Sequence, residues 1–287
     1  MKTPGTMKRY LTAALLLLLT IPAAAQSARD SVALATARWQ TTPLGDGAEA
    51  RTTQVELFGA PQHLALVIYP ARAFSTRVVQ VEGRGRIPSR IGQEAGAEAA
   101  INGSYFNMRE VEPITFTLSD GEVVNRGTMH NSPLSNGVVA ARGRKGNRVE
   151  VFPCDSTDYA RIARRYRQAL VAGPMLVHEG REQSYDTEDA IFTRRHPRTV
   201  VGTRPDGKVV LLVIDGRFKE QAAGTTVAET AYIARQLGLT EALNLDGGGS
   251  SSLWTRQEGV LNHPTDNRRY DHEGERSVPN GIVVLKR

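Results

Sequence analysis

The segment Asp246-Gly247-Gly248-Gly249-Ser250 places one carboxylate directly before three consecutive glycines. Glycine loses more backbone freedom on folding than any other residue, so three in a row favour a functional explanation. Glycines adopt positive φ, allow a ligand to approach the backbone closely and can direct successive N–H groups toward an anion. The segment therefore predicts an anion-binding turn in which Asp246 supplies a fixed carboxylate.

The residues after the glycines argue against a nucleotide-binding loop. Leu253 and Trp254 predict a strand, whereas phosphate loops of the nucleotide-binding type lead into a helix. Those loops also end in Gly-Lys-Ser or Gly-Lys-Thr, and no lysine follows the glycines here. The ligand expected at this turn is an anion of another class.

Further polar turns adjoin apolar strands and offer carboxylate, guanidinium and amide groups. These groups suit a hydroxyl-rich anion such as a sugar phosphate. If the strands share one sheet, the turns converge with residues 246–250 on one cleft, which is a hypothesis at this point. The turns contain Asn102, Gly103, Tyr105, Phe106 and Asn107; His196, Pro197 and Arg198; and Asp215, Gly216 and Arg217.

Strand signals dominate the chain, and they predict an α+β fold with a large mixed, mainly antiparallel β-sheet core, a few flanking helices and a single domain. The apolar strand 209–214 is expected at the centre of the sheet. Hairpins are predicted around 119–121, 143–147 and 205–207, and a meander is predicted from runs at 54–57, 64–69 and 78–81.

Helices are expected at 91–98, 159–170 and 225–237. In the last of these, Thr226 is an N-cap and Glu229 stands three residues later, which is the spacing of a capping box. This spacing gives Glu229 a structural explanation beside any chemical one.

The N-terminal residues have the pattern of a cleaved signal peptide. Basic residues at Lys2, Lys8 and Arg9 precede an apolar run at 11–21, and small residues follow it, so cleavage is expected near Ala25. An uncleaved anchor is the alternative, but the run is short for a spanning helix and no later run is long enough. The expected location after cleavage is periplasmic or secreted.

The chain is thus divided into a signal peptide at 1–25, a lead-in at 26–52 and a catalytic domain at 53–287. A strand within the lead-in is expected at 37–40. Half of the formal charge of +6 belongs to the signal peptide, and the remaining basic residues lack aromatic interleaving, so nucleic-acid binding is not expected. The lone Cys154 permits no intramolecular disulfide, so a hydrophobic core must supply the stability.

The sequence predicts no required cofactor, and it leaves the metal ligands and the oligomeric state undefined. His263, Asp266, Asp271 and His272 lie in a polar loop whose residue types suit a metal, although their spacing matches no metal motif and a solvated loop is favoured. A divalent ion such as calcium stays an alternative. The serines at 250–252 lack the elbow motif of a serine hydrolase.

Several motifs together resemble the phosphodiester glycosidase domain family, over roughly residues 101 to 285. Their order along the chain is the order found in that family, which makes the set far more specific than any single motif. The motifs are Asn102-Gly103-Ser104-Tyr105-Phe106, Gly173-Pro174-Met175-Leu176-Val177, Arg198-Thr199-Val200-Val201-Gly202, Val213-Ile214-Asp215-Gly216-Arg217, the helix carrying Glu229, and Asn244-Leu245-Asp246-Gly247-Gly248-Gly249-Ser250.

The resemblance implies hydrolysis of a sugar-1-phosphodiester, such as one of N-acetylglucosamine, at the anomeric carbon. Phosphate leaves readily, so such a site needs positive charge more than a strong general acid. Arg198 is expected to hold the phosphate together with the N–H groups of residues 247–250, and His196 is a further candidate. Asp246, Asp215 and Glu229 are the candidate catalytic carboxylates, with Asp246 the strongest.

Two alternatives stay open at this point. A non-catalytic module that binds cell-envelope glycan or exopolysaccharide would keep the cleft without turnover. A metal-dependent phosphodiesterase would attack phosphorus instead of carbon. Each candidate side chain also has a structural explanation as a turn, cap or surface residue.

Overall fold

The computed structural model describes residues 23–143 and 147–287. Within these ranges the strands form three larger sheets and one two-stranded ribbon, and every strand pair in them is antiparallel. The predicted α+β class with mainly antiparallel strands and few helices is confirmed, although the strands divide among several sheets. Most of the predicted signal peptide, residues 1–22, lies outside the described residues.

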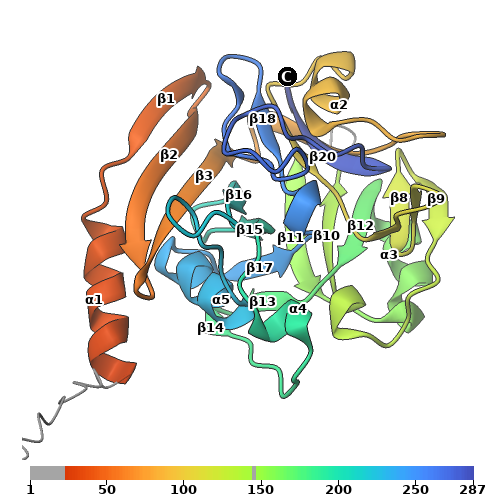
Figure 1. Ribbon diagram of the computed structural model, residues 1–287. Helices are drawn as coiled ribbons and strands as arrows, with labels where there is room; N and C mark the ends of the chain where they lie inside the picture. The colour runs from red at the N-terminus through yellow and green to blue at the C-terminus, as the bar shows by residue number, and fades with distance from the viewer. Residues whose placement is uncertain (1–22, 144–146) are drawn as a thin grey trace, which may run out of the picture.

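The largest sheet has eight strands in the order β1-β2-β3-β16-β15-β17-β13-β14 (Figure 1). Its central strands β3 and β16 are apolar on both faces, as predicted for residues 209–214. The strand bounds are Gln40–Gly45 (β1), Ala48–Leu57 (β2), Ala60–Pro70 (β3), Met175–His178 (β13), Arg181–Glu182 (β14), Arg198–Thr203 (β15), Lys208–Ile214 (β16) and Glu241–Asn244 (β17).

Two five-stranded sheets complete the core, in the orders β11-β10-β12-β8-β9 and β19-β18-β5-β20-β4. Their strands are Phe74–Gln80 (β4), Ala99–Asn102 (β5), Phe116–Ser119 (β8), Glu122–Arg126 (β9), Gly137–Arg142 (β10), Arg148–Pro153 (β11), Gln168–Ala172 (β12), Leu253–Thr255 (β18), Gly259–Val260 (β19) and Asn280–Lys286 (β20). The small ribbon pairs Phe106–Asn107 (β6) with Glu112–Pro113 (β7).

The helices lie on the outside of the sheets. Figure 1 shows α1 beside β1 and β2 at one edge, and α3 beside β8 and β9 at the other. Their bounds are Ala23–Ala35 (α1), Pro88–Glu94 (α2), Tyr159–Arg165 (α3), Ala190–Thr193 (α4) and Val227–Gln236 (α5), with 3-10 turns at Pro133–Ser135 (η1), Ser156–Asp158 (η2) and Gly248–Ser250 (η3). Among the helices of the described residues, none is long and apolar enough to cross a membrane.

The main hydrophobic core lies where the three sheets face one another. Alternate residues of β3, such as Val67 and Tyr69, enter this core, while Leu66 and Ile68 point to the opposite face. That opposite face is covered by α1 and α5 through residues such as Leu34 and Ala231. The strand period of two explains how β3 is buried on both faces.

Several local predictions are confirmed. The hairpins β8–β9 and β15–β16 form at the predicted turns, and β10 pairs with β11 as expected, although residues 144–146 of the turn predicted between them lie outside the described residues. Helix α5 begins after Thr226, whose side chain accepts from the Glu229 N–H while the Glu229 carboxylate accepts from the Thr226 N–H. Strand β18 follows the glycines, as Leu253 and Trp254 predicted.

Other local predictions are wrong. The expected helix 159–170 ends at Arg165, because residues 168–172 become β12, which pairs with β10 and β8 and is buried throughout. The expected meander is broken, since β4 pairs with β20 in a different sheet from β3. Long-range pairing overrides local signals at both places.

The expected lead-in is part of the fold. It contains most of α1, strand β1 and the beginning of β2, so the boundary expected at residue 53 falls inside a strand of the eight-stranded sheet. Gly45 and Gly47, both with positive φ, flank the turn that pairs β1 with β2. Strand β1 begins at Gln40, where the expected strand ends.

Candidate active site

The four polar turns meet at one end of the eight-stranded sheet. The Asp246 N–H donates to the Gly103 carbonyl at 3.1 Å, and Asn102 Nδ2 donates to the Asp246 carbonyl at 2.7 Å. The Gly248 N–H donates to the Pro197 carbonyl at 2.9 Å. The turn at 215–217 joins them through Arg217, whose guanidinium lies beside Gly248. The hypothesis of convergence is therefore confirmed.

Asn102, a candidate ligand-binding residue from the sequence, uses its side-chain amide for contacts within the protein. It is fully buried, and its Oδ1 accepts from Thr199 Oγ1 at 3.0 Å and from the Ser252 N–H at 3.2 Å. With Nδ2 on the Asp246 carbonyl, one amide holds both ends of the 246–252 turn. Buried amides of this kind need such partners because an unpaired polar group is costly.

At each of the three glycines a neighbouring group occupies the space that a side chain would need. A Cβ at Gly247 would lie 2.7 Å from the Pro197 carbonyl oxygen, which is closer than a real contact allows. Gly248 has φ of +63°, and a Cβ there would lie 2.9 Å from Nη2 of Arg217. The glycines thus let the turn pack tightly against backbone on one side and a guanidinium on the other.

The predicted cradle of free N–H groups is only partly present. The Gly248 N–H donates to Pro197, and the Ser250 N–H donates to the Gly247 carbonyl at 3.2 Å, so both donors are used within the protein. The Gly247 N–H donates a hydrogen bond to the carboxylate of Asp246. The turn therefore positions Asp246 and leaves most of the anion binding to side chains.

Asp246 is the carboxylate best suited to proton transfer at neutral pH. Burial raises its pKa from 3.8 to about 6, while the hydroxyl of Ser250, the charge of Arg276 and the Gly247 N–H oppose the shift. A buried carboxyl with a pKa near the working pH is typical of catalytic acids and bases. Asp246 stands two residues after the end of β17, an interior strand of the eight-stranded sheet, so that strand fixes its position.

Two arginines lie against the glycine turn. A Cβ at Gly248 would meet Nη2 of Arg217, and a Cβ at Gly249 would lie only 2.3 Å from Nη2 of Arg276. Both arginines line one cavity of about 350 Å³, which we call the arginine pocket. Its lining residues are Arg217, Phe218, Thr265, Asp266, Arg268 and Arg276.

The arginine pocket carries more positive than negative charge. Arg276 forms an ion pair with Asp266, and Arg217 Nη1 donates to Thr265 Oγ1 at 3.1 Å. Burial and the nearby charge of Arg276 both lower the pKa of Arg217, which Asp266 opposes. Among the described residues that line it, three are arginines and only one, Asp266, carries a carboxylate. An anion bound there would form charge-assisted hydrogen bonds with the guanidinium groups and offset their mutual repulsion.

Arg198, the arginine expected from the sequence to hold the phosphate, does not line this pocket. Its guanidinium is buried and donates to three backbone carbonyls, those of Thr225 at 2.8 Å, Ile191 at 2.7 Å and Arg194 at 3.0 Å. Burial lowers its pKa to about 10. Arg198 therefore fastens the segment around α4 to the sheet.

Glu229 has structural partners for both carboxylate oxygens. It completes the capping box with Thr226 and forms an ion pair with Arg195, with Oε1 at 2.6 Å from Nη2. Arg195 Nη2 also donates to the Phe58 carbonyl at 2.8 Å. The contacts of Glu229 support a role in the stability of α5, and they give no support to catalysis.

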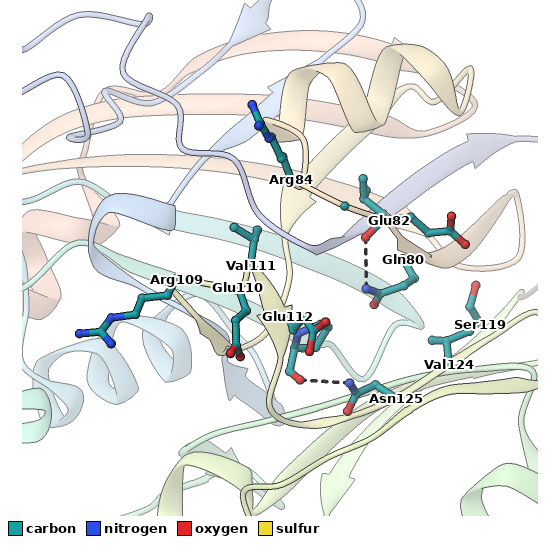
Figure 2. A pocket seen from close by; sticks show the side chains of 13 residues that line it. Gln80, Glu82, Arg84, Arg109, Glu110, Val111, Glu112, Ser119, Val124 and Asn125 are labelled. Carbon is teal, nitrogen blue, oxygen red and sulfur yellow. Dashed lines mark hydrogen bonds between the residues drawn. The ribbon is translucent and has the colours of Figure 1, made fainter.

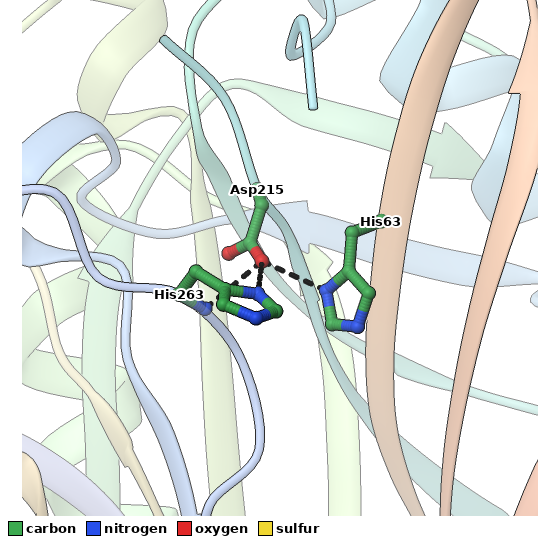
Figure 3. Close-up of side chains that lie close together, drawn as sticks. All are labelled: His63, Asp215 and His263. Atoms are coloured by element: carbon green, nitrogen blue, oxygen red, sulfur yellow. Dashed lines mark hydrogen bonds and ion pairs between the residues drawn. The ribbon is translucent and has the colours of Figure 1, made fainter. Parts of the chain in front are cut away.

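Asp215 is buried behind the arginine pocket and anchors two histidines. Its Oδ2 lies 2.7 Å from Nδ1 of His63 and 2.8 Å from Nδ1 of His263, as Figure 3 shows. Burial acts to raise the pKa of Asp215, but the hydrogen bonds from His263 and His63 outweigh it and hold the pKa at about 2. Because these groups enclose its carboxylate, Asp215 is not placed to attack a substrate directly.

The remaining predicted site residues surround the turn without forming a second cluster. Tyr105 Oη donates to the Gly173 carbonyl at 2.7 Å and accepts from Asn244 Nδ2 at 3.0 Å. Phe106 packs on the core beside α2, and Asn107 shapes a surface turn with Glu110. His196 pairs through its backbone with Thr225, and burial lowers the pKa of its ring.

Sequence reasoning missed Arg276 and His63 as site residues. Arg276 lies in a polar loop with no motif of its own, and only its contact with Gly249 reveals it. His63 lies in β3 just before the apolar run of that strand, and it meets Asp215 because Leu64 pairs with Ile214 across β3 and β16. No local signal in the sequence predicts that pairing.

A cavity of about 810 Å³ opens between the β6–β7 ribbon, the β8–β9 hairpin and residues 80–84 (Figure 2). Its lining side chains are of mixed charge and include Glu82, Glu112, Arg84 and Arg109. Of the predicted site residues, Phe106 and Asn107 belong to the β6 strand beside this cavity, but none of them lines it. The polar turns that carry most of the other predicted site residues meet around Asp246, so Asp246 and the arginine pocket remain the stronger candidate for chemistry.

The phosphodiester glycosidase family matches residues 95–285 of the chain. The chain belongs to this family. The predicted resemblance to this family is thereby confirmed. All the motifs that meet at the site, from Asn102 to the glycine turn, lie inside the matched range.

The sequence is also similar to that of a mouse enzyme, N-acetylglucosamine-1-phosphodiester alpha-N-acetylglucosaminidase. The two are 26% identical over 210 residues, which cover 67% of this chain and 39% of the mouse protein. A prophage-derived protein of Bacillus subtilis is 32% identical over 107 residues, which cover 37% of this chain and 16% of that protein. The chain thus spans well under half the length of both relatives.

Solved structures share the fold. The zebrafish N-acetylglucosamine-1-phosphodiester alpha-N-acetylglucosaminidase catalytic domain, auto-inhibited by its pro-peptide, matches with a TM-score of 0.66 and 18% identity over 88% of this chain and 89% of that one. A protein of Burkholderia pseudomallei described as exported matches with a TM-score of 0.62 and 16% identity over 80% of this chain and 75% of that one. At these identities the likeness concerns the fold alone.

Proposed function

We propose that the protein is an exported glycosidase that hydrolyses a sugar-1-phosphodiester at the anomeric carbon, giving free sugar and a phosphomonoester. One observation carries the proposal, namely that Arg217 and Arg276 lie against the same glycine turn that positions Asp246. A phosphate held in the arginine pocket would therefore lie beside a carboxyl whose pKa is about 6.

The reaction breaks the bond between the anomeric carbon and the phosphate oxygen. The phosphate oxygen keeps the electron pair, and its developing charge is stabilised by the guanidinium groups of Arg217 and Arg276. Water adds its oxygen to the anomeric carbon, and the carboxylate of Asp246 stabilises the positive charge on the sugar and takes the proton of the water. That proton then passes to solvent.

The sugar and the location belong to the same proposal. N-acetylglucosamine is the first candidate because the similar mouse enzyme is named for it. Export is supported by the signal-peptide pattern of the first 25 residues and by the exported description of the Burkholderia relative. The substrate would then be envelope or extracellular material.

The test uses purified protein and a panel of sugar-1-phosphodiesters that includes N-acetylglucosamine-1-phosphodiesters. We expect release of free sugar and phosphomonoester, and when the reaction runs in oxygen-18 water the phosphomonoester stays unlabelled. Label in the phosphomonoester would instead identify attack at phosphorus, as in a phosphodiesterase. Binding of the panel without turnover would identify a glycan-binding module and overturn the proposal.

A further inference from the structure

His63 and His263 lie on either side of Asp215, and their ring nitrogens point at one carboxylate oxygen (Figure 3). One ligand atom from each of the three residues lies within 4.8 Å of the other two. Imidazole nitrogen and carboxylate oxygen are the donors of catalytic zinc sites with two histidines and one acidic residue. The cluster therefore has the composition and the compactness of a metal site.

The three residues come from separate parts of the chain, and the fold holds them rigidly. His63 belongs to β3, Asp215 follows β16, and the Asp215 N–H donates to the His63 carbonyl at 3.0 Å. His263 enters from the loop after β19, and its own N–H donates to Asp215 Oδ2 at 2.9 Å. Such separate origins are typical of sites that a fold assembles.

A second layer of contacts orients these side chains. Asn262 Nδ2 donates to the other carboxylate oxygen of Asp215 at 3.0 Å, and the ring of His263 stacks on Tyr270 with 3.7 Å between ring centroids. Metal-binding carboxylates and histidines commonly have outer partners of this kind, which fix their direction.

The cluster also borders open space. A cavity of about 460 Å³ is lined by His63 and His263, together with His272 and Glu258. A metal held by three protein ligands leaves one tetrahedral position unfilled, and this cavity can supply a water or another ligand for it. Histidines that only form an ion pair with Asp215 could be enclosed on all sides, whereas His63 and His263 both border this cavity.

We propose that His63, His263 and Asp215 bind a divalent transition-metal ion of the zinc class. The ring Nδ1 atoms and Asp215 Oδ2 are the ligands, and each imidazole then carries its proton on Nε2. Zinc ligands at about 2.1 Å from the ion stand roughly 3.4 Å apart. The Nδ1 to Oδ2 distances of 2.7 and 2.8 Å must therefore widen by about 0.6 to 0.7 Å on binding.

The ion would connect the segments that form the arginine pocket. Arg217 stands two residues after Asp215, Thr265 stands two residues after His263, and these two side chains are hydrogen-bonded to each other. The metal is thus proposed to hold the pocket in shape. It takes no step in the reaction proposed above.

Metal binding is tested on the purified full-length protein without any substrate, after stripping with a chelator and dialysis against Zn²⁺ or Co²⁺. We expect about one equivalent of metal by elemental analysis, the visible absorption of tetrahedral Co²⁺, and a rise in melting temperature with Zn²⁺. His63→Ala and His263→Gln should weaken metal binding by at least tenfold while circular dichroism shows a retained fold.

His178→Ala is the matched control, because His178 pairs with Glu241 at 2.9 Å but has no second histidine across the carboxylate. It should bind metal like the unmutated protein. The proposal is overturned if folded, unmutated protein retains less than about a tenth of an equivalent, or if the His63 variant binds as much as the control. Because no substrate is used, these outcomes are separate from those of the glycosidase assay.

Discussion

The guanidinium of Arg276 fills the space that a side chain at Gly249 would need, with Nη2 only 2.3 Å from the position of a Cβ. The absence of a side chain at residue 249 therefore admits a charged group from a loop almost thirty residues further along the chain. The same loop supplies Asp266, whose ion pair with Arg276 sets the direction of the guanidinium.

Gly249→Ala should displace Arg276 and raise the KM for a sugar-1-phosphodiester by about tenfold, with a smaller effect on the melting temperature. Steady-state kinetics measure this. Gly207→Ala is the control for KM, because Gly207 also lies in a turn, has open space around it and lines no part of the arginine pocket. Its φ of +78° makes this control variant less stable by itself. The prediction fails if both variants change KM equally.

Asp246→Asn should reduce turnover by about 10²- to 10⁴-fold, because an amide neither takes a proton nor carries a charge. The same change should stabilise the protein at pH 8 by about 1–3 kcal/mol, since it removes a charge whose burial is costly. Denaturant unfolding measures the stability. A variant that loses both activity and stability would indicate a merely structural carboxylate.

The pH dependence of stability follows from the same carboxyl. Its pKa rises from 3.8 to about 6 on folding, so the folded protein holds a proton that the unfolded chain releases between these values. The contribution of Asp246 to the free energy of unfolding is therefore most favourable below about pH 4. It decreases as the pH rises to about 6, and it no longer changes above that pH. Parallel unfolding of the Asn variant should lack this decrease.

Activity should show the opposite trend with pH. If the carboxylate is the active form, kcat/KM increases with a midpoint near pH 6, so that the value at pH 5 is about a tenth of that at pH 7. Initial rates at low substrate concentration from pH 4.5 to 8 measure the midpoint. A profile that is flat across pH 6 would remove Asp246 from the proton-transfer role.

Arg217→Gln should raise KM by about 10- to 100-fold with the fold intact, because a charge-assisted hydrogen bond contributes about 1.5–3 kcal/mol. Arg198→Ala should instead lower stability by about 3 kcal/mol or more, since it leaves buried carbonyls without donors. Kinetics and unfolding of the two variants separate the roles. Equal loss of substrate binding in both would return Arg198 to the phosphate site.

Glu229→Gln should lower the melting temperature by a few degrees and leave kcat within about twofold, because its carboxylate serves the cap and Arg195. The measurement combines thermal unfolding with the phosphomonoester assay. A loss of turnover comparable to that of the Asp246 variant, without loss of stability, would assign Glu229 a chemical role after all.

The elements that local signals specify were predictable from the sequence. Turn residues identify the β15–β16 hairpin, and the Thr226–Glu229 spacing identifies the start of α5. Asp246 was identified because a carboxylate before three glycines is unusual on physical grounds. In each case the relevant residues lie within a few positions of one another.

The parts that depend on distant pairing were not predictable in this way. The pairing of β4 with β20 joins opposite ends of the chain. The guanidinium of Arg198 already donates to backbone carbonyls, whereas that of Arg217 lines a pocket. This difference favours Arg217 as the candidate phosphate ligand. By residue type both arginines are plausible phosphate ligands, and only the groups around each guanidinium in the folded structure distinguish them.

Asn102 belongs to β5 in one sheet, while its partner Thr199 lies in β15 of the eight-stranded sheet and its partner Asp246 follows β17 of that same sheet. The alignment of the Asp246 carboxyl is therefore set by how two sheets are oriented toward each other. Substitutions deep in their shared interior, at positions such as Leu243 or Leu253, would misalign the carboxyl without touching a substrate. Their signature would be a slower turnover at unchanged affinity.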